Sequence, residues 1–160
     1  MPEPKPAPEL DTSAWLNASA PITLAGLRGR VVVIEAFQML CPGCVQHGLP
    51  QLARVREAFP EPDVAVLGLH TVFEHHAAQG TRVALEAFLH EYRYGFPVGI
   101  DRPGDDGDPI PRTMRAYALR GTPSLLLIDR RGRLRQHTFG QVSELRLGAE
   151  IQSLIAERDP

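Results

Sequence analysis

The sequence is poor in the features that would identify several classes of protein. It has only two cysteines in 160 residues, which excludes a small domain stapled by several disulfides. No apolar run approaches the roughly 20 residues of a membrane-spanning helix. Lys5 is the only lysine, and the net charge of −2 favours neither a nucleic acid nor an anionic membrane as a partner. What remains is the composition of an ordinary globular protein, with 43% hydrophobic residues.

The N-terminal segment also lacks a targeting signal. Residues 1–12 are rich in proline and charge, and they contain no apolar core of a signal peptide. We expect these residues to form a disordered or extended tail, and residues 13–160 to form a single domain. The simplest expected location is the cytoplasm, where a cysteine pair is more often catalytic than structural.

The two cysteines belong to one Cys-X-X-Cys motif, Cys41-Pro42-Gly43-Cys44. The apolar run over residues 31–37 predicts a buried strand before it. After Pro42, apolar residues recur at spacings of three and four, which predicts an amphipathic helix to about residue 59, kinked or interrupted at Pro50. The motif therefore lies where a strand passes into a helix, with Pro42 at the first helical position.

That position indicates thiol chemistry. A helix N-terminus favours a thiolate, so we expect Cys41 to be the attacking sulfur and Cys44, one turn further in, to be the resolving one. Two ordinary buried cysteines, or half of a zinc site, are the alternatives. A structural zinc site needs four ligands, and the chain has no second CxxC and no HxxxH motif. We expect no metal and no cofactor other than the redox-active pair.

The rest of the chain alternates strands with helices. We expect strands at residues 64–69, 96–100, 123–129 and 134–139, and helices at 81–92, 111–118 and 143–157. Arg131-Gly132 predicts a hairpin turn between the last two strands. This order predicts a three-layer α/β fold with a mixed sheet.

The combination of motifs resembles the thioredoxin superfamily. The strand–CxxC–helix unit resembles its active-site segment, and Gly121-Thr122-Pro123-Ser124 resembles the loop that holds its cis-proline. The lead-in over residues 22–32 is similar to the branch of bacterial thiol–disulfide oxidoreductases and peroxiredoxin-like proteins of the AhpC/TSA and redoxin type. The resemblance covers about Trp15 to Ile155. It implies a thioredoxin-like fold, a central mixed sheet flanked by helices, with an insertion between the second strand and the cis-proline loop.

The resemblance also implies a substrate-binding surface and a buried acid. Pro123 would be the cis-proline, and Thr122 would offer its backbone to substrate beside Leu40 and Pro42. Glu35, six residues before Cys41, corresponds to the buried carboxyl that takes a proton from the resolving cysteine. The alternative for this glutamate is a carboxylate that reaches solvent or an arginine at the sheet edge.

His47, one turn after Cys44, is a candidate for tuning the thiol pKa or shuttling protons. An exposed helix histidine without a role is the alternative. Thioredoxin has Trp before its first cysteine and Gly-Pro between the two, whereas this chain has Leu40 and Pro-Gly, so the direction of electron flow stays open.

The leading hypothesis is a thiol–disulfide oxidoreductase, working as a reductase on disulfide-bearing proteins or small molecules. A reductase or low-molecular-weight thiol would restore the cysteine pair. A peroxiredoxin-type, antioxidant peroxidase is the runner-up, in which Arg120 could supply the guanidinium that steers peroxide. Gln38 argues against it, because that enzyme needs Thr or Ser three residues before the attacking cysteine. A redox-sensing binding module without catalysis is the third possibility.

Overall fold

Six strands form one mixed sheet in the order β1-β4-β3-β2-β5-β6, in a computed structural model that describes residues 2–158. The strands are β1 (Thr12–Leu16), β2 (Val31–Phe37), β3 (Val64–His70), β4 (Val98–Asp101), β5 (Ser124–Ile128) and β6 (Leu134–Phe139). The helical elements are η1 (Ala25–Leu27), η2 (Cys44–Gly48), α1 (Leu49–Ala58), α2 (His76–Gln79), α3 (Arg82–Glu91), α4 (Arg112–Ala116) and α5 (Glu144–Ala156).

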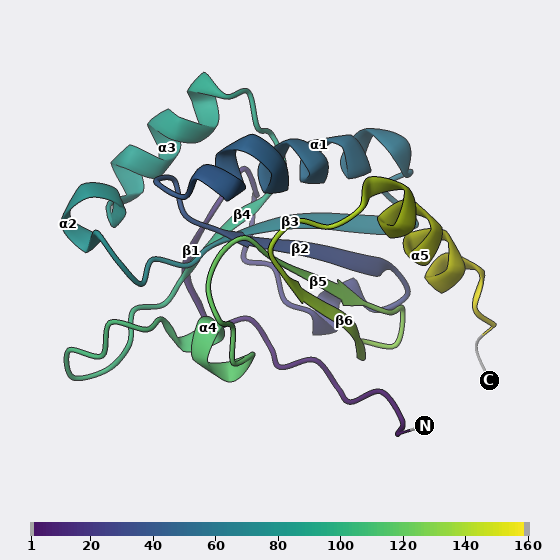
Figure 1. Ribbon diagram of the computed structural model, residues 1–160. Helices are drawn as coiled ribbons and strands as arrows, with labels where there is room; N and C mark the ends of the chain where they lie inside the picture. The colour runs from purple at the N-terminus through teal and green to yellow at the C-terminus, as the bar shows by residue number, and fades with distance from the viewer. Residues whose placement is uncertain (1, 159–160) are drawn as a thin grey trace.

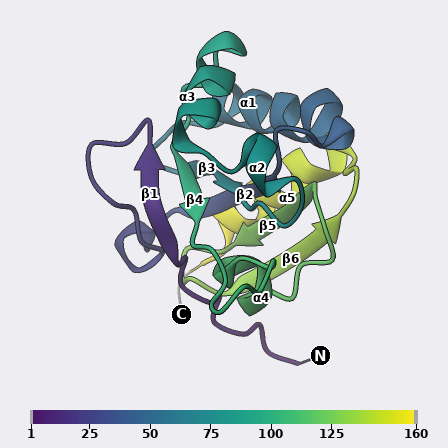
Figure 2. The same cartoon turned by 90° about the vertical axis from the view of Figure 1, so that its left-hand side faces the viewer.

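Strand β2 lies inside the sheet and carries the chain into the cysteine motif. It pairs in parallel with β3 and antiparallel with β5, while β1 and β6 form the two antiparallel edges. Helices α1, α3 and α5 cover one face of the sheet, and α4 with the N-terminal segment covers the other (Figures 1 and 2). The three-layer α/β fold with a mixed sheet is therefore confirmed. The segment expected to be an insertion holds α2, α3 and β4.

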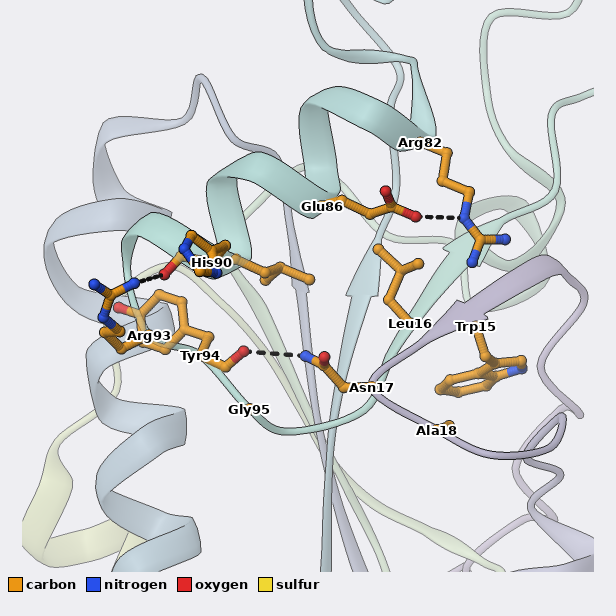
Figure 3. Close-up of a pocket in the computed structure, with 11 residues that line it drawn as sticks. Trp15, Leu16, Asn17, Ala18, Arg82, Glu86, His90, Arg93, Tyr94 and Gly95 are labelled. Atoms are coloured by element: carbon orange, nitrogen blue, oxygen red, sulfur yellow. Dashed lines mark hydrogen bonds and ion pairs between the residues drawn. The ribbon is translucent and has the colours of Figure 1, made fainter.

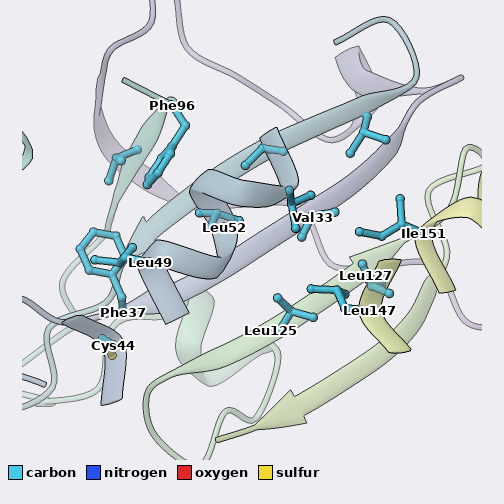
Figure 4. Packing of buried hydrophobic residues seen from close by; sticks show 14 of the residues in the cluster. Val33, Phe37, Cys44, Leu49, Leu52, Phe96, Leu125, Leu127, Leu147 and Ile151 are labelled. Carbon is cyan, nitrogen blue, oxygen red and sulfur yellow. The ribbon is translucent and has the colours of Figure 1, made fainter. Parts of the chain in front are cut away.

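The two faces of the sheet bury two separate apolar clusters. Every residue of β2 is buried, and alternation along the strand sends its side chains to opposite faces. Val31, Val33 and Phe37 pack under α1, with Cys44 and the apolar side of α5 (Figure 4). Val32, Ile34 and Ala36 of β2 pack on the α4 side. Because Glu35 shares the register of Val33 and Phe37, its carboxyl belongs to the α1 face, below the helix that follows the cysteines.

The helix predicted over residues 42–59 is interrupted, as its internal proline suggested. A wide π-helical turn, η2, spans Cys44–Gly48, and regular α-helix begins at Leu49. Pro50 has no N–H to offer the carbonyl four residues earlier, so the preceding turn opens instead of continuing the α-helical ladder.

The N-terminal part differs from the disordered tail that was one expectation for it, and it contains a strand that was not predicted. Residues 2–12 do not form a free tail. Ala7 N–H donates to the Gly132 carbonyl, Leu134 N–H donates to the Lys5 carbonyl, and Leu10 is buried against the α4 side of the sheet. The strand β1, which begins at Thr12, was not predicted at all. It is a short, half-exposed edge strand whose partner β4 lies more than 80 residues further along the chain, so local pattern carried little signal for it.

Candidate active site

A disulfide joins Cys41 and Cys44, whose Cα atoms are 5.2 Å apart. Cys44 is fully buried, whereas Cys41 keeps part of its surface open to solvent. The helical run begins at Pro42, and the backbone N–H of Cys44 points at Cys41 Sγ from 3.2 Å. Cys41 is therefore the more accessible of the two sulfurs, and it lies at a helix N-terminus beside an N–H donor, a position that generally favours a thiolate.

The loop before β5 closes over the same sulfur. The Thr122–Pro123 peptide bond is cis, the form that the family resemblance implies. The carbonyl oxygen of Thr122 lies 3.5 Å from Cys41 Sγ, close enough to accept the S–H of the reduced cysteine. Leu40 and Pro42 are exposed beside the disulfide, and 56% of the Leu40 surface is accessible. The structure thus gathers the four residues predicted to meet substrate around one partly open sulfur.

Glu35 lies beneath this arrangement and is almost completely buried. Burial raises the pKa of its carboxyl from 4.5 to about 8. No described residue forms an ion pair with it or donates a hydrogen bond to it, so nothing offsets the loss of hydration. A Cβ atom at Gly48 would lie 2.6 Å from Oε1 of Glu35 and 3.2 Å from Cβ of Pro123. Glycine at this position therefore lets the helix approach the acid and the cis-proline closely.

A small cavity connects Glu35 with the surface. It has a volume of about 210 Å³, and its lining includes Glu35, His47 and Pro123. Two residues of its lining are joined by a hydrogen bond, because the Gln51 side-chain amide donates to the Val142 carbonyl at 3.0 Å. The predicted acid and the predicted histidine therefore line the same cavity, in which Glu35 is buried and His47 is exposed.

An ion pair between Arg54 of α1 and Glu144 of α5 lies at the same cavity. Both side chains are about half exposed, so the pair ties the two helices only weakly.

Among residues 2–158, no three His, Cys, Asp or Glu side chains gather in a way that could hold a metal ion. His70, at the end of β3, is a buried neutral side chain instead. Its ring packs against Phe37 with centroids 5.1 Å apart, and burial lowers its pKa from 6.5 to about 4.

A larger hollow lies away from the disulfide. It has a volume of about 740 Å³ and is lined by Trp15, the Arg82–Glu86 ion pair and Tyr94, between β1 and α3 (Figure 3). None of the predicted site residues lines it, and Trp15 in its wall is itself partly exposed. The volume of a cavity therefore does not identify the active site here, because thiol exchange needs an exposed sulfur and not a deep pocket.

Two buried glutamines near the disulfide were missed as functional candidates. Gln38 entered the sequence analysis only as a mismatch to peroxidases, and Gln79 did not enter it. Each is 1% exposed, and they are hydrogen-bonded to each other at 3.1 Å. The only sequence signal was a polar residue directly after a buried strand.

Comparison with known proteins agrees with this geometry. The model of the AhpC/TSA family matches residues 4–137. A thioredoxin-like superfamily protein of known crystal structure is 64% identical, with a TM-score of 0.94 over 98% of this chain and 99% of that one. A thiol-disulfide isomerase from Corynebacterium glutamicum is 48% identical, with a TM-score of 0.91 over 96% and 97% of the two chains.

Curated relatives are more distant. Thiol-disulfide oxidoreductase ResA from Bacillus cereus is 25% identical over 133 residues, which cover 83% of this chain and 68% of ResA. Protein DipZ from Mycobacterium tuberculosis is 29% identical over 141 residues, and the chain spans only 18% of the length of DipZ. No helix within residues 2–158 is long and apolar enough to cross a membrane. On the family match, the fold and the Cys41–Cys44 disulfide, the chain belongs to the AhpC/TSA family and is a thiol–disulfide oxidoreductase with a thioredoxin-like fold.

Proposed function

We propose that this oxidoreductase works as a disulfide reductase, with Cys41 as nucleophile and Cys44 as resolving cysteine. The observation that carries the proposal is the asymmetry of the pair. Cys41 is partly open and receives the Cys44 N–H at 3.2 Å, whereas Cys44 is fully buried. An incoming disulfide therefore meets Cys41 first.

In the first step the Cys41 thiolate attacks one sulfur of the substrate disulfide. The substrate S–S bond breaks, a mixed disulfide with Cys41 forms, and the other substrate sulfur leaves as a thiolate. Cys44 then loses its proton and attacks the Cys41 sulfur, which releases the second substrate thiolate. Two electrons pass from the cysteine pair to the substrate, and the Cys41–Cys44 disulfide remains.

Glu35 is proposed as the proton acceptor for Cys44. Its pKa of about 8 lies near neutral pH, so the ionised fraction of the carboxyl can take the proton of Cys44 as a general base. The cavity that Glu35 shares with His47 supplies the route by which that proton reaches solvent. Both assignments rest on position in the fold and on the family resemblance.

Extended substrate is proposed to bind across Leu40, Pro42 and Thr122, where exposed apolar surface lies beside Cys41. Substrates would be disulfide-bearing proteins or small disulfides, and a reductase or a low-molecular-weight thiol would reduce the pair again. This direction suits a reducing compartment such as the cytoplasm, which we propose as the location.

A peroxiredoxin-type peroxidase is less well supported. The side-chain amide of Gln38, at the position where such enzymes carry Thr or Ser, donates to Thr122 and accepts from Gln79. Arg120 lies over the ring of Phe139, with Cζ 5.9 Å from its centroid. These groups are engaged with protein partners and not aimed at an incoming peroxide.

The test combines two variants with a redox titration. Cys44→Ser should accumulate a mixed disulfide with a protein disulfide substrate such as insulin, and Cys41→Ser should form none. The wild-type pair should titrate as a two-electron couple near the roughly −270 mV of thioredoxin, while a value near about −120 mV would make it an oxidant. Turnover that survives in Cys41→Ser would overturn the assignment of the nucleophile. Peroxide consumption that needs only Cys41 would favour the peroxidase.

A further inference from the structure

Two buried glutamines connect the segments that surround the attacking cysteine. Gln38 follows β2 directly, and Gln79 is the last residue of α2, in the segment between β3 and β4. Both are only 1% exposed. Buried amides of this kind are costly unless their hydrogen bonds are made, so their partners indicate what they hold in place.

The direction of every hydrogen bond in this pair is determined by backbone groups. The N–H of Leu40 can only donate, and it donates to Oε1 of Gln79 at 3.0 Å. The amide nitrogen of Gln79 must then be the donor to Oε1 of Gln38, at 3.1 Å, and that oxygen also accepts the N–H of Phe73 at 3.2 Å. The amide nitrogen of Gln38 is therefore left to donate to the hydroxyl of Thr122 at 3.3 Å.

These hydrogen bonds of Gln38 and Gln79, here called the relay, run from the Leu40 N–H to the Thr122 hydroxyl. Leu40 and Thr122 are the two residues that flank the reactive sulfur. Leu40 precedes Cys41 in the chain, and the carbonyl oxygen of Thr122 lies 3.5 Å from Cys41 Sγ. A carbonyl oxygen accepts the proton of a thiol but repels a thiolate, so its effect on the sulfur opposes that of the Cys44 N–H, which favours the thiolate. The balance between the two sets how much of Cys41 is ionised.

We propose that Gln38 and Gln79 are positioning residues that hold the Thr122 carbonyl against Cys41 Sγ and thereby keep the cysteine pair reducing. A thiolate that is strongly stabilised favours the reduced form and makes such a pair an oxidant. The relay limits that stabilisation. This inference deepens the proposed reductase function and rests on it for its biological meaning, but its physical content is a property of the cysteine pair itself.

The experiment compares isosteric apolar variants in the full chain. Gln38→Met and Gln79→Met each break the relay, and Gln46→Met makes the same substitution at an exposed glutamine two residues after Cys44. Alkylation of Cys41 in the reduced protein is followed against pH by peptide mass. The pair is also equilibrated in dithiol/disulfide buffers of graded potential.

Breaking the relay should move the alkylation midpoint to lower pH and raise the thiolate fraction at pH 7 about threefold to tenfold, or half to one pH unit. The reduction potential should become less negative by up to about 30 mV, since that is a tenfold change for a two-electron couple. Gln46→Met should match wild type in both measurements.

A third variant keeps the inference testable if a glutamine variant folds poorly. Thr122→Val removes the acceptor at the end of the relay, so it should give a similar shift, and adding it to Gln38→Met should increase the shift little. Folded variants whose alkylation profile and potential equal those of wild type, or shift in the opposite direction, would overturn the proposal. Neither measurement needs a physiological substrate. Failure to reduce any disulfide would therefore defeat the proposed function while the relay shifts could still be measured.

Discussion

The protonation of Glu35 is the most specific quantity that the structure predicts. Burial raises the pKa of this carboxyl from 4.5 to about 8, which corresponds to about 5 kcal/mol at about 1.4 kcal/mol per pH unit. Between these two pH values the folded chain keeps a proton that the unfolded chain releases. The contribution of Glu35 to the free energy of unfolding is therefore largest below the lower pKa, and it is lost as pH rises through the upper one.

His70 acts in the opposite direction over part of this range. Because its pKa is lowered from 6.5 to about 4, the unfolded chain takes up that proton first, and stability is lost as pH falls through this window. The two effects offset each other in mild acid. Above about pH 6.5 only the Glu35 contribution of this pair remains, so wild type should lose about 2 kcal/mol between about pH 6.5 and about pH 8.5.

The perturbation that tests this is Glu35→Gln, which keeps the size of the side chain and removes its titration. Urea unfolding is measured with the disulfide intact, so that no thiol titrates in the same range. The slope of stability against pH should be largely lost in Glu35→Gln, with Glu57→Gln, an exposed glutamate of α1, as the matched control that retains it. Equal slopes for wild type and Glu35→Gln would refute the reasoning, because the carboxyl would then not be neutral at pH 7.

Two further predictions concern buried polar residues around the sheet. The free energy of unfolding of His70→Leu, measured in urea, should rise by about 2 kcal/mol relative to that of wild type between about pH 7 and about pH 5. The reason is that unfolding of wild type frees a buried imidazole to take up a proton, which the variant lacks. A constant difference at both pH values would contradict the lowered pKa. Asp101→Ala should cost about 3 kcal/mol or more in urea unfolding, because the carboxylate accepts the N–H groups of Thr113 and Met114 and the hydroxyl of Thr71. A loss below about 1 kcal/mol would show that water replaces these bonds.

Much of the sheet and the place of the cysteine motif could be predicted from short stretches of sequence. Strand β2 has the predicted bounds, because its seven consecutive residues are all buried and all but Glu35 are apolar. Pro42 begins the helical run that follows, and the helix is interrupted before Pro50, since a missing N–H acts on its own turn whatever the rest of the fold does. Strand β1 escaped prediction because its pairing with β4 joins segments more than 80 residues apart.

The residues predicted for the site also divide into those that short stretches of sequence could place and those that needed the fold. Adjacent positions in the chain were enough to place Cys41 at a helix N-terminus and Cys44 one turn inside it, and the resemblance added Pro123. The roles of Glu35 and His47 stay predictions, although both line one cavity. The Gln38–Gln79 pair could not be predicted, because a buried amide in a sequence does not reveal which distant backbone groups satisfy it.

The strands after β1, the strand-to-helix position of the cysteines and the expectation that Cys41 is the nucleophile follow from local periodicity, proline geometry and the helix N-terminus, all of which act over a few residues. Which acid is desolvated, which carbonyl faces the sulfur and which polar side chains connect the loops depend on distant segments, and the hydrogen bonds of Gln38 alone join residues 35 to 84 positions apart. Desolvation and hydrogen-bond partners are properties of a packed interior, so only the folded chain determines them.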